Sequence, residues 1–595
     1  MLNFVVFEYA SDGTARAHPA WGLKHAYVFG ADDVPVQAEV RTEAGYIRCE
    51  TRTKDSAGLA LQFPVDAPET SGLSGELAER VKRLRGDGAG GGGGNGSVGV
   101  VTLQTCLLPS REKPYLLSLE LARHRLMAFF NKLEDWALFD LPGDHPALAL
   151  FERARRAFTL ALVEAAKKDA SEKGCGGFSP ASDRLARSAL SLAVEASELL
   201  TLEQARTQFA KRASGELAAA AAKAVTPLNA ITDHEAAHSR NLLIGNVGVI
   251  LPTPVQVGVM VNPNAFTPAL TKAAQGCCDF LCMPMRWVDM EPTEGKYLFS
   301  NTDRWIEWAV RTARVPVVGG PIIELRRGCV PEWMYIWEHD YETLRELVYE
   351  HTRNIVTRYR RTVGTWTVCS GLHVASNFAL SFEQMMDLTR LVVMVVRKLQ
   401  PSAKIQVQID QPWGEYVGAS SRSIPPLVYA DMVLQAGVNP DLFALRIETG
   451  QPEPGQSTRD LLALSAMLDK YASFDRPLSI ATVSAPSKTA AAESLGLDEE
   501  LEPGYYRAPW SPSSQALWMT RALGVMAAKP YVHSVCWHEL FDAAPPLVPA
   551  PGGKAADNRF DGLLDHEGNA KPALARLGAI RAAVKSKQSP LTLES

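Results

Sequence analysis

The sequence lacks a long apolar run. None of its 595 residues falls in an uninterrupted stretch of about 18 apolar residues, the length that a membrane-spanning helix needs. The first residues, Met1 to Tyr9, have no basic region, carry Glu8 among apolar side chains and offer no small-residue cleavage site, so they resemble a β-strand more than a secretory signal. We therefore expect no membrane partner.

An excess of positive charge is also absent. The chain has 61 Lys and Arg against 66 Asp and Glu, which gives a formal net charge of −5. Binding to a phosphate backbone requires clustered cations, so we expect no nucleic-acid partner.

Cysteine is sparse, with nine residues at spacings that match no disulfide-rich module. An odd, scattered set fits a reducing compartment, and we expect a cytoplasmic protein. Cys277, Cys278 and Cys282 lie in the apolar segment Cys-Cys-Asp-Phe-Leu-Cys. This setting favours core packing over metal ligation.

Apolar alternation indicates a β-rich, sandwich-like domain over residues 1–118. The expected strands are 3–9, 25–29, 36–41, 46–51, 59–63 and 98–107. A glycine-rich insertion at 86–99 includes a run of five glycines and lacks the Lys-Ser/Thr of a phosphate-binding loop. We predict a flexible insertion and no nucleotide site, and we expect no cofactor.

A helical period follows, and residues 119–244 are predicted to form a helical connector. The periodic stretches are 119–136, 146–168 and 181–224. Their apolar stripes can pack on the preceding sheets or on the following domain, or can form a contact in a homo-oligomer. The sequence leaves these alternatives open.

From about residue 245, short apolar strands alternate with amphipathic helices, the pattern of parallel βαβ units. Strands are expected at 255–261, 280–283, 315–319, 364–369, 404–409, 442–447, 478–483 and 532–537. This number of repeats predicts an α/β fold, a (β/α)8 TIM barrel, over residues 245–585, with a tail at 586–595.

One segment of this barrel carries a family resemblance. Residues 285–299 read M-R-W-V-D-M-E-P-T-E-G-K-Y-L-F, followed by Asp303 and Trp308-Ala309. This resembles the M-K-W-x-x-x-E-P-x-x-G-x-F-x-F pattern of glycoside hydrolase family 10, the endo-β-1,4-xylanases. Further stretches occur in the family's order: Pro331-Glu332-Trp333, Gly364-Thr365-Trp366, Val535-Cys536-Trp537, Gly562-Leu563-Leu564-Asp565 and Lys571-Pro572-Ala573.

The resemblance implies retaining hydrolysis of β-1,4-xylan by two glutamates about 5 to 5.5 Å apart. The family's acid/base motif W-D-V-V-N-E reads W-T-V-C-S-G at 366–371, which puts Gly371 at the glutamate position. The nucleophile motif I-T-E-L-D reads I-A-T-V-S at 480–484, which puts Thr482 there. Without either carboxylate we expect no standard retaining catalysis.

The family's substrate-binding positions have also changed, since its third-strand histidines fall on Gly320 and Leu325. Several candidates for glycan contact remain: Arg286, Trp287, Trp333, Ser370, Asp410 and Trp537. Trp413 is a further candidate for stacking on a sugar face. Trp305, Trp308 and Trp518, at helical spacing, are expected to pack helices onto the barrel.

Other carboxylates follow the expected strands, at the end of the barrel where TIM-barrel sites form. They are Glu324, Asp410, Glu415, Glu448, Glu539 and Asp542. Two of them about 6.5 to 9.5 Å apart would suit an inverting glycosidase. Glu448 and Glu539 are the pair we select, although each taken singly is more typical of a loop salt bridge.

The segment His234-Glu235-Ala236-Ala237-His238 matches H-E-x-x-H, the spacing that places two zinc ligands on one helix face. Its polar surroundings, between Pro227 and Gly245, are unlike those of a zinc-protease helix. A polar turn entering the barrel is the alternative interpretation of His234 and His238.

Three functions remain open from the sequence. The first is a barrel that binds an oligosaccharide or polysaccharide without hydrolysing it. The second is an active glycanase that uses relocated carboxylates, and the third is an oligomeric scaffold. The fold alone does not select among them.

Overall fold

The structure is a computed structural model that describes residues 1–9, 15–17, 25–43, 46–52, 55–68, 98–167, 176–224, 249–326, 328–374, 378–418, 420, 422–451, 453, 455–489, 503–542 and 559–594. The H-E-x-x-H segment with His234 and His238 lies outside these residues, as does the glycine-rich insertion up to residue 97.

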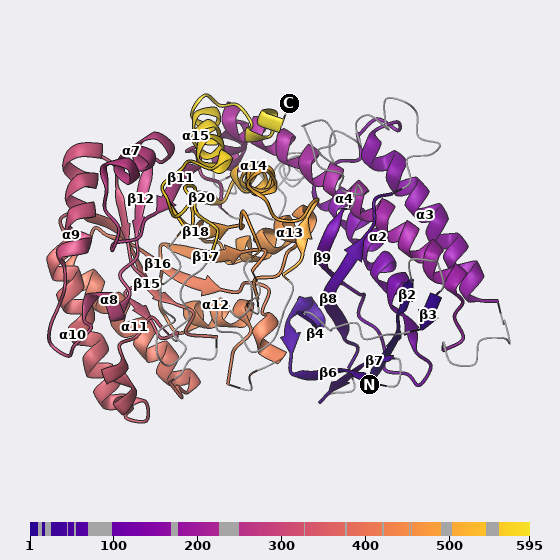
Figure 1. Ribbon diagram of the computed structural model, residues 1–595, viewed down its shortest axis with the longest axis horizontal. Coiled ribbons are helices and arrows are strands. Elements are labelled where there is room, and N and C mark those ends of the chain that lie inside the picture. The colour runs from indigo at the N-terminus through magenta and orange to yellow at the C-terminus, as the bar shows by residue number, and fades with distance from the viewer. Residues whose placement is uncertain are drawn as a thin grey trace.

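Two β-sheets build the N-terminal part of the molecule (Figure 1). Their strand orders are β10-β1-β7-β6 and β19-β9-β8-β4-β5, and β2 and β3 form a separate hairpin. The strands are β1 (Leu2–Val5), β2 (Phe7–Tyr9), β3 (Ala15–Ala17), β4 (Tyr27–Phe29), β5 (Pro35–Val36), β6 (Ala38–Glu43), β7 (Tyr46–Thr51), β8 (Gly58–Val65), β9 (Gly99–Gln104) and β10 (Tyr115–Leu116). The expected N-terminal sheets are confirmed, although the expected strands 3–9 and 36–41 are each divided between two strands, and β3 and β10 were not expected.

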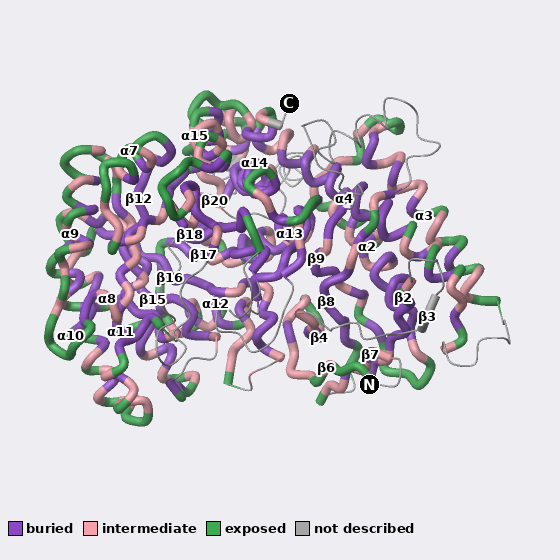
Figure 2. The backbone as a smooth tube through the Cα atoms, viewed as in Figure 1, coloured by how far each residue is buried: buried purple, intermediate pink, exposed green. Residues whose placement is uncertain are grey.

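A layer of helices follows: α2 (Leu117–Asp135), α3 (Pro146–Ala165), α4 (Pro180–Ser214) and α5 (Glu216–Ala224). Helix α4 begins where Ser179 Oγ accepts from the Ser182 amide at 3.2 Å, and it ends at Gly215, whose φ of 81° is left-handed. Its N-terminal half packs on the sheets through Leu190 and Val194, and its second half packs on the barrel through Leu199 and Leu200. Helix α4 is therefore buried along much of its length between the two parts (Figure 2).

The second half of the chain forms a closed barrel of eight parallel strands within the described residues. They are β11 (Gln256–Met260), β12 (Phe280–Met283), β13 (Val317–Gly319), β15 (Val363–Ser370), β16 (Lys404–Asp410), β17 (Leu442–Glu448), β18 (Leu478–Ser484) and β20 (Val532–Trp537). The short strand β14 (Ile323–Glu324) lies beside β15, and the pairings β11–β20 and β13–β15 close the ring. The predicted (β/α)8 barrel is confirmed.

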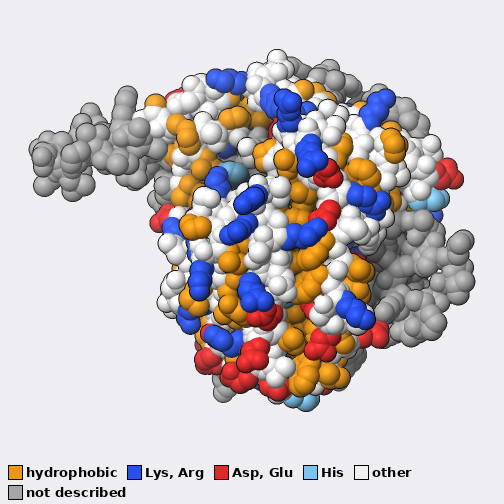
Figure 3. Space-filling model, turned by 90° about the vertical axis from the view of Figure 1, so that its left-hand side faces the viewer, with side chains coloured by type: hydrophobic (Ala, Val, Ile, Leu, Met, Phe, Trp, Pro, Cys, Tyr) orange, Lys and Arg blue, Asp and Glu red, His pale blue; other side chains and the backbone are white. Residues whose placement is uncertain are grey.

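Helices surround this ring, as the alternation of elements predicts. They are α7 (Pro268–Cys277), α8 (Trp287–Met290), α9 (Ser300–Glu307), α10 (Tyr341–Tyr359), α11 (Phe382–Leu399), α12 (Pro426–Gln435), α13 (Leu461–Ala472), α14 (Pro512–Ala528) and α15 (Pro572–Lys585), with short turns η1 (Ala31–Asp33), η2 (Trp308–Ala313), η3 (Glu332–Trp337), η4 (Glu415–Gly418) and η6 (Pro590–Glu594). On the flank that carries α9 and α10, Lys and Arg are interspersed with apolar and acidic side chains (Figure 3). Within the described ranges, no helix has the length and apolarity to cross a membrane.

The barrel lumen has an apolar side and a polar side. Phe280, Cys282 and Cys536 form a small apolar cluster of their own, separate from the main core. On β17, Phe443, Leu445 and Ile447 belong to the main core between strands and helices, so the alternating Arg446 and Glu448 face the lumen. The polar side lies toward the strands that supply the candidate site.

One strand joins the two halves of the molecule. The segment after β18 returns to the N-terminal part, and β19 (Tyr505–Tyr506) pairs antiparallel with β9. Arg507, next along the chain, forms buried ion pairs with Glu195 and Glu198 of α4. The predicted boundaries at residues 118 and 244 stay predictions, but the sheet that starts in the first predicted domain is completed by the third.

Candidate functional site

The polar ends of four neighbouring strands meet at the C-terminal mouth of the barrel. Ser370, Asp410, Glu448 and Ser484 are the last residues of β15, β16, β17 and β18. Because all four strands are parallel, these side chains share one end, where catalytic groups of such barrels are carried. All four residues are buried.

The family's acid/base position, Gly371, directly follows Ser370. Its φ is +62°, a left-handed conformation that favours glycine. An ideal Cβ at this position would lie 2.8 Å from Asp410 Oδ2. The space that a glutamate side chain would enter is therefore filled by Asp410.

Asp410 is held firmly in that space. Ser370 Oγ donates to Asp410 Oδ1 at 2.9 Å, and Gln408 Nε2 donates to the same oxygen at 3.0 Å. Gln408 also donates to Ser370 Oγ at 2.8 Å, which closes a three-membered network. Ser370 and Asp410, proposed from the sequence as glycan contacts, thus bind each other inside the barrel.

The family's nucleophile position, Thr482, is opposite a cation. In the β17–β18 register Thr482 pairs with Arg446, and both are on the lumen side. Arg446 donates to Glu448 at 2.8 Å from Nε and 3.0 Å from Nη2, and its Nη1 lies 3.4 Å from Glu324 Oε1. A threonine paired in register with an arginine therefore lies where the resemblance would place the nucleophile.

Glu448 is bound by two arginines. In addition to Arg446, Arg559 Nη1 donates to Glu448 Oε1 at 2.5 Å. Burial alone would raise the pKa of Glu448, but the attraction of Arg446 and Arg559 outweighs it and holds the pKa well below its usual range. Glu448 therefore stays ionised and cannot serve as a proton donor at neutral pH.

The selected pair, Glu448 and Glu539, contacts the two nitrogen atoms of one histidine. His538 Nδ1 lies 4.0 Å from Glu448 Oε1, and His538 Nε2 lies 3.9 Å from Glu539 Oε2. The Glu539 side chain is 20% exposed, whereas that of Glu448 is 3% exposed. The structure thus brings the two carboxylates near each other, with an imidazole between them.

Asp561, which the sequence did not lead us to predict, adds a carboxyl group whose pKa is shifted in the direction opposite to that of Glu448. It is buried, and Gln451 Nε2 donates to its Oδ1 at 2.6 Å. Burial raises the pKa of Asp561 to about 7, with Arg559 opposing the rise and the Glu448 carboxylate adding to it. One available signal was its place directly before the Gly562-Leu563-Leu564-Asp565 stretch, which resembles the family's closing motif.

Three other candidate carboxylates have structural partners. Glu415 accepts from the Gly455 amide at 2.8 Å and from Ser457 Oγ at 2.7 Å, and it pairs with Arg459. Asp542 accepts from the Gly562 amide at 2.8 Å and pairs with Lys571. Glu324 accepts from Arg326 Nε at 2.6 Å. Glu415 and Asp542 each tie two separate loops together, whereas the partner of Glu324 lies two residues further along the same segment.

Two of the four candidate tryptophans are buried and two are half-buried. Trp287 is 2% exposed and stacks on His351 at 4.0 Å between ring centroids. Trp537 is 1% exposed, packs against Trp518 and donates to the Asp561 carbonyl oxygen at 3.0 Å. Trp333 and Trp413 are half-buried, so only this second pair retains accessible surface for a sugar.

Arginines dominate the accessible part of the mouth. The Arg326 side chain is 31% exposed and lies between Glu324 and Asp410, and Arg446 is partly exposed beside it. Arg286 is also partly exposed and pairs with Asp289 at 2.7 Å. Arg446 carries a sequence signal that we did not use, because a charged residue interrupts the apolar strand Leu-Phe-Ala-Leu-Arg-Ile-Glu.

The cysteines behave as core residues. Cys277, Cys278 and Cys282 are buried, and Cys278 Sγ lies 3.0 Å from the Ala274 carbonyl oxygen. In the described part of the chain, no group of three or more His, Cys, Asp or Glu residues has an arrangement that could hold a metal ion.

Comparison with known proteins gives a likeness in fold. No family model matches the sequence. Xylanase 10B of Thermotoga maritima covers 56% of this chain with 96% of its own, at 15% identity and a TM-score of 0.40. An intracellular xylanase of Thermoanaerobacterium saccharolyticum, in complex with xylotriose, covers 54% with 94% of its own, at 15% identity and a TM-score of 0.39. Both are similarities to single solved structures, and the barrel itself follows from the strand pairings described above.

Proposed function

We propose that this protein binds a glycan at the C-terminal mouth of its barrel and does not perform retaining glycoside hydrolysis. The observation that carries the proposal is the pairing of Gly371 with Asp410, whose carboxylate fills the acid/base space. With Thr482 at the nucleophile position, the mouth offers no pair of carboxylates at these two places.

Arg326, Arg446 and Glu539 support the binding half of the proposal. Their side chains are partly exposed and supply guanidinium donors and a carboxylate acceptor around one opening. Such groups hydrogen-bond to sugar hydroxyls, and the half-buried Trp333 can offer an aromatic face.

The direct test combines binding with hydrolysis. Isothermal titration calorimetry with xylotriose, cellotriose and maltotriose should show binding, while reducing-end release from the corresponding polymers should stay at background. Arg326→Ala should weaken binding at least ~10-fold, a loss of about 1.4 kcal/mol. Arg311→Ala is the matched control, because its exposed ion pair with Glu307 lies on η2, away from the mouth. Rapid release of reducing ends by the wild-type protein would contradict the proposal.

A second function is favoured by the contrast between two buried carboxyl groups at this mouth. The pKa of Glu448 is held well below its usual range and burial raises the pKa of Asp561 to about 7, and such a separation of pKa values is what an acid and a base require. In this alternative, an active glycanase uses relocated carboxylates, with Glu539 the accessible member. Glu539→Gln or Glu448→Gln would then abolish reducing-end release in a folded protein. Unchanged release in both variants would contradict it.

The same assay should be repeated with a chelator, because His234 and His238 remain candidate ligands. Activity that disappears with the chelator would assign the chemistry to a metal, and activity that persists would assign it to the mouth.

A further inference from the structure

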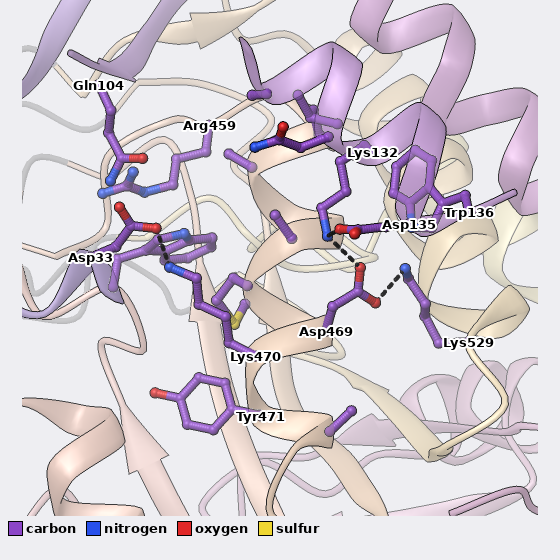
Figure 4. A pocket seen from close by; sticks show the side chains of 18 of the residues that line it. Asp33, Gln104, Lys132, Asp135, Trp136, Arg459, Asp469, Lys470, Tyr471 and Lys529 are labelled. Carbon is purple, nitrogen blue, oxygen red and sulfur yellow. Dashed lines mark hydrogen bonds and ion pairs between the residues drawn. The ribbon is translucent and has the colours of Figure 1, made fainter. Parts of the chain in front are cut away.

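A pocket lies between the helical layer and the flank of the barrel, and one end of it reaches the loop after β16. Its volume is about 1010 Å³, the upper end of the range for small-molecule sites. Residues from α2, α4 and α13 line it, together with residues near β9 and the loop after β16. Figure 4 shows its charged side chains grouped at two separate sides.

Small side chains create the space. Ala463 and Ala466 lie on one face of α13, and Ala128 of α2 also lines the pocket. Both α13 alanines are only half-buried although helices face them. A larger residue at these positions would therefore occupy part of the pocket.

At one side, a carboxylate joins two lysines beside an indole ring. Asp469 accepts from Lys529 Nζ at 2.7 Å, from Lys132 Nζ at 3.3 Å and from Tyr531 Oη at 2.6 Å. The two ammonium groups lie 5.3 and 5.7 Å from the centre of the Trp136 ring (Figure 4). Asp469 and Lys132 are the partly exposed members of this cluster, with side chains 25% and 17% exposed, and they lie beside the half-buried Trp136.

At the other side, Lys470 pairs with Asp33 (Figure 4). Arg459, which also lines the pocket, pairs with Glu415. The Arg459 guanidinium carbon also lies 4.6 Å from the centre of the Trp413 ring. Trp413 and Trp136 are both half-buried, so each side of the pocket has one partly accessible tryptophan.

The balance of charge selects the kind of ligand. Three of the four lysines that line the pocket, Lys132, Lys470 and Lys529, have carboxylate partners. An anionic ligand would have to compete there with Asp33, Asp135 and Asp469. Hydroxyl groups, in contrast, can accept from the lysines and donate to the same carboxylates without displacing either.

Side-chain amides add to this pattern. Gln104, Asn131, Gln204 and Gln208 line the pocket. Gln204 is 6% exposed, and its Oε1 has no hydrogen-bond donor among the described residues. A buried acceptor of this kind gains when a ligand hydroxyl approaches.

We propose that this pocket binds a short, neutral oligosaccharide, with its ring faces against Trp136 and Trp413 and its hydroxyls on the Asp469 and Lys470 clusters. The proposal takes its ligand class from the proposed function and adds a second site to it.

The test fills the pocket without removing a polar group. In titration calorimetry with xylotriose, cellotriose and maltotriose at millimolar concentration, Ala466→Phe should weaken binding at least ~10-fold at one of two sites. Ala575→Phe is the matched control, because Ala575 is an exposed alanine of α15 outside the pocket lining. Circular dichroism should show that both variants keep the wild-type fold.

Arg326→Ala separates the two proposals. It should remove binding at the barrel mouth and leave the site that Ala466→Phe removes. If Ala466→Phe binds all three sugars as the wild type does, or if none of the sugars binds to the wild type, the pocket proposal is wrong. If inorganic phosphate or citrate binds in the pocket and the sugars do not, the neutral ligand class is wrong.

Discussion

Asp410 occupies the place of a missing side chain at Gly371. The two residues are at the ends of adjacent strands, and the carboxylate of the first lies 2.8 Å from the point where the second would begin a side chain. A glutamate at residue 371 would therefore meet an occupied space.

A pair of alanine variants measures how firmly Asp410 is packed against residue 371. Gly371→Ala must adopt a left-handed conformation, which costs about 1–2 kcal/mol, and must also displace Asp410. Gly437→Ala is the control, because its φ is +73° and nothing lies within 4 Å of its ideal Cβ. In urea denaturation, Gly371→Ala should lose more stability than Gly437→Ala. Equal losses would show that Asp410 moves aside freely.

From the raised pKa of Asp561 we predict that the free energy of unfolding falls as the pH rises toward neutral. Its pKa rises from an ordinary value of 3.8 to about 7 in the folded protein, so the folded state binds more protons than the unfolded state in this interval. The resulting stability is fully present below about pH 4 and is lost as pH rises through about 7, a change of roughly 4 kcal/mol.

Asp561→Asn should remove this dependence of stability on pH. The amide keeps the shape of the protonated acid and can still accept from Gln451. Denaturation midpoints measured between pH 5 and 8 should fall for the wild type and change less for the variant. Parallel curves would mean that Asp561 does not titrate in this interval.

The ion pair between Arg507 and Glu195 should stabilise the contact between the two halves. It is fully buried, with Nη1–Oε2 at 2.6 Å, and Glu198 lies 3.3 Å from Nη2. Arg507→Met leaves two buried carboxylates without their cation and should cost about 3–5 kcal/mol. The double variant Arg507→Met/Glu195→Gln should recover part of the loss in urea denaturation, and additive losses would argue against direct coupling.

The helical layer allows a test of the scaffold hypothesis. Leu160 and Val163 of α3 are each 57% exposed, one helical turn apart. If this face forms a homo-oligomer, sedimentation velocity should show a species larger than the monomer that Leu160→Ser/Val163→Ser dissociates. The exposed Ile336→Ser on η3 is the control. A monomer at micromolar concentration would count against the scaffold.

The periodic elements could be predicted because burial imposes them on the sequence. Each expected barrel strand has its counterpart in the ring, since a strand covered by helices must be apolar on its outer face. Most of the N-terminal strands were found from the same apolar pattern, but the short strands β3 and β10 were not. In contrast, β19 has two residues and pairs with a strand far away in the chain. A segment this short has no apolar alternation from which it could be predicted.

The site was less predictable than the fold. The resemblance located Gly371 and Thr482, but the partners that fill or flank these positions, Asp410 and Arg446, depend on side-chain packing between strands. Trp287 and Trp537 keep the residue type of the resemblance, yet both are buried among neighbouring side chains. The residue type alone does not show whether an aromatic ring is exposed to solvent.

Strand β19 also affects the order in which the protein can fold during synthesis. The edge of β9 at Val100 has its partner only when Tyr505 has left the ribosome. Until then, the sheet that contains β9 has an unpaired edge at this strand. Unpaired strand edges can pair with other chains. The N-terminal part of this protein therefore depends on the late arrival of a barrel segment to protect it from aggregation.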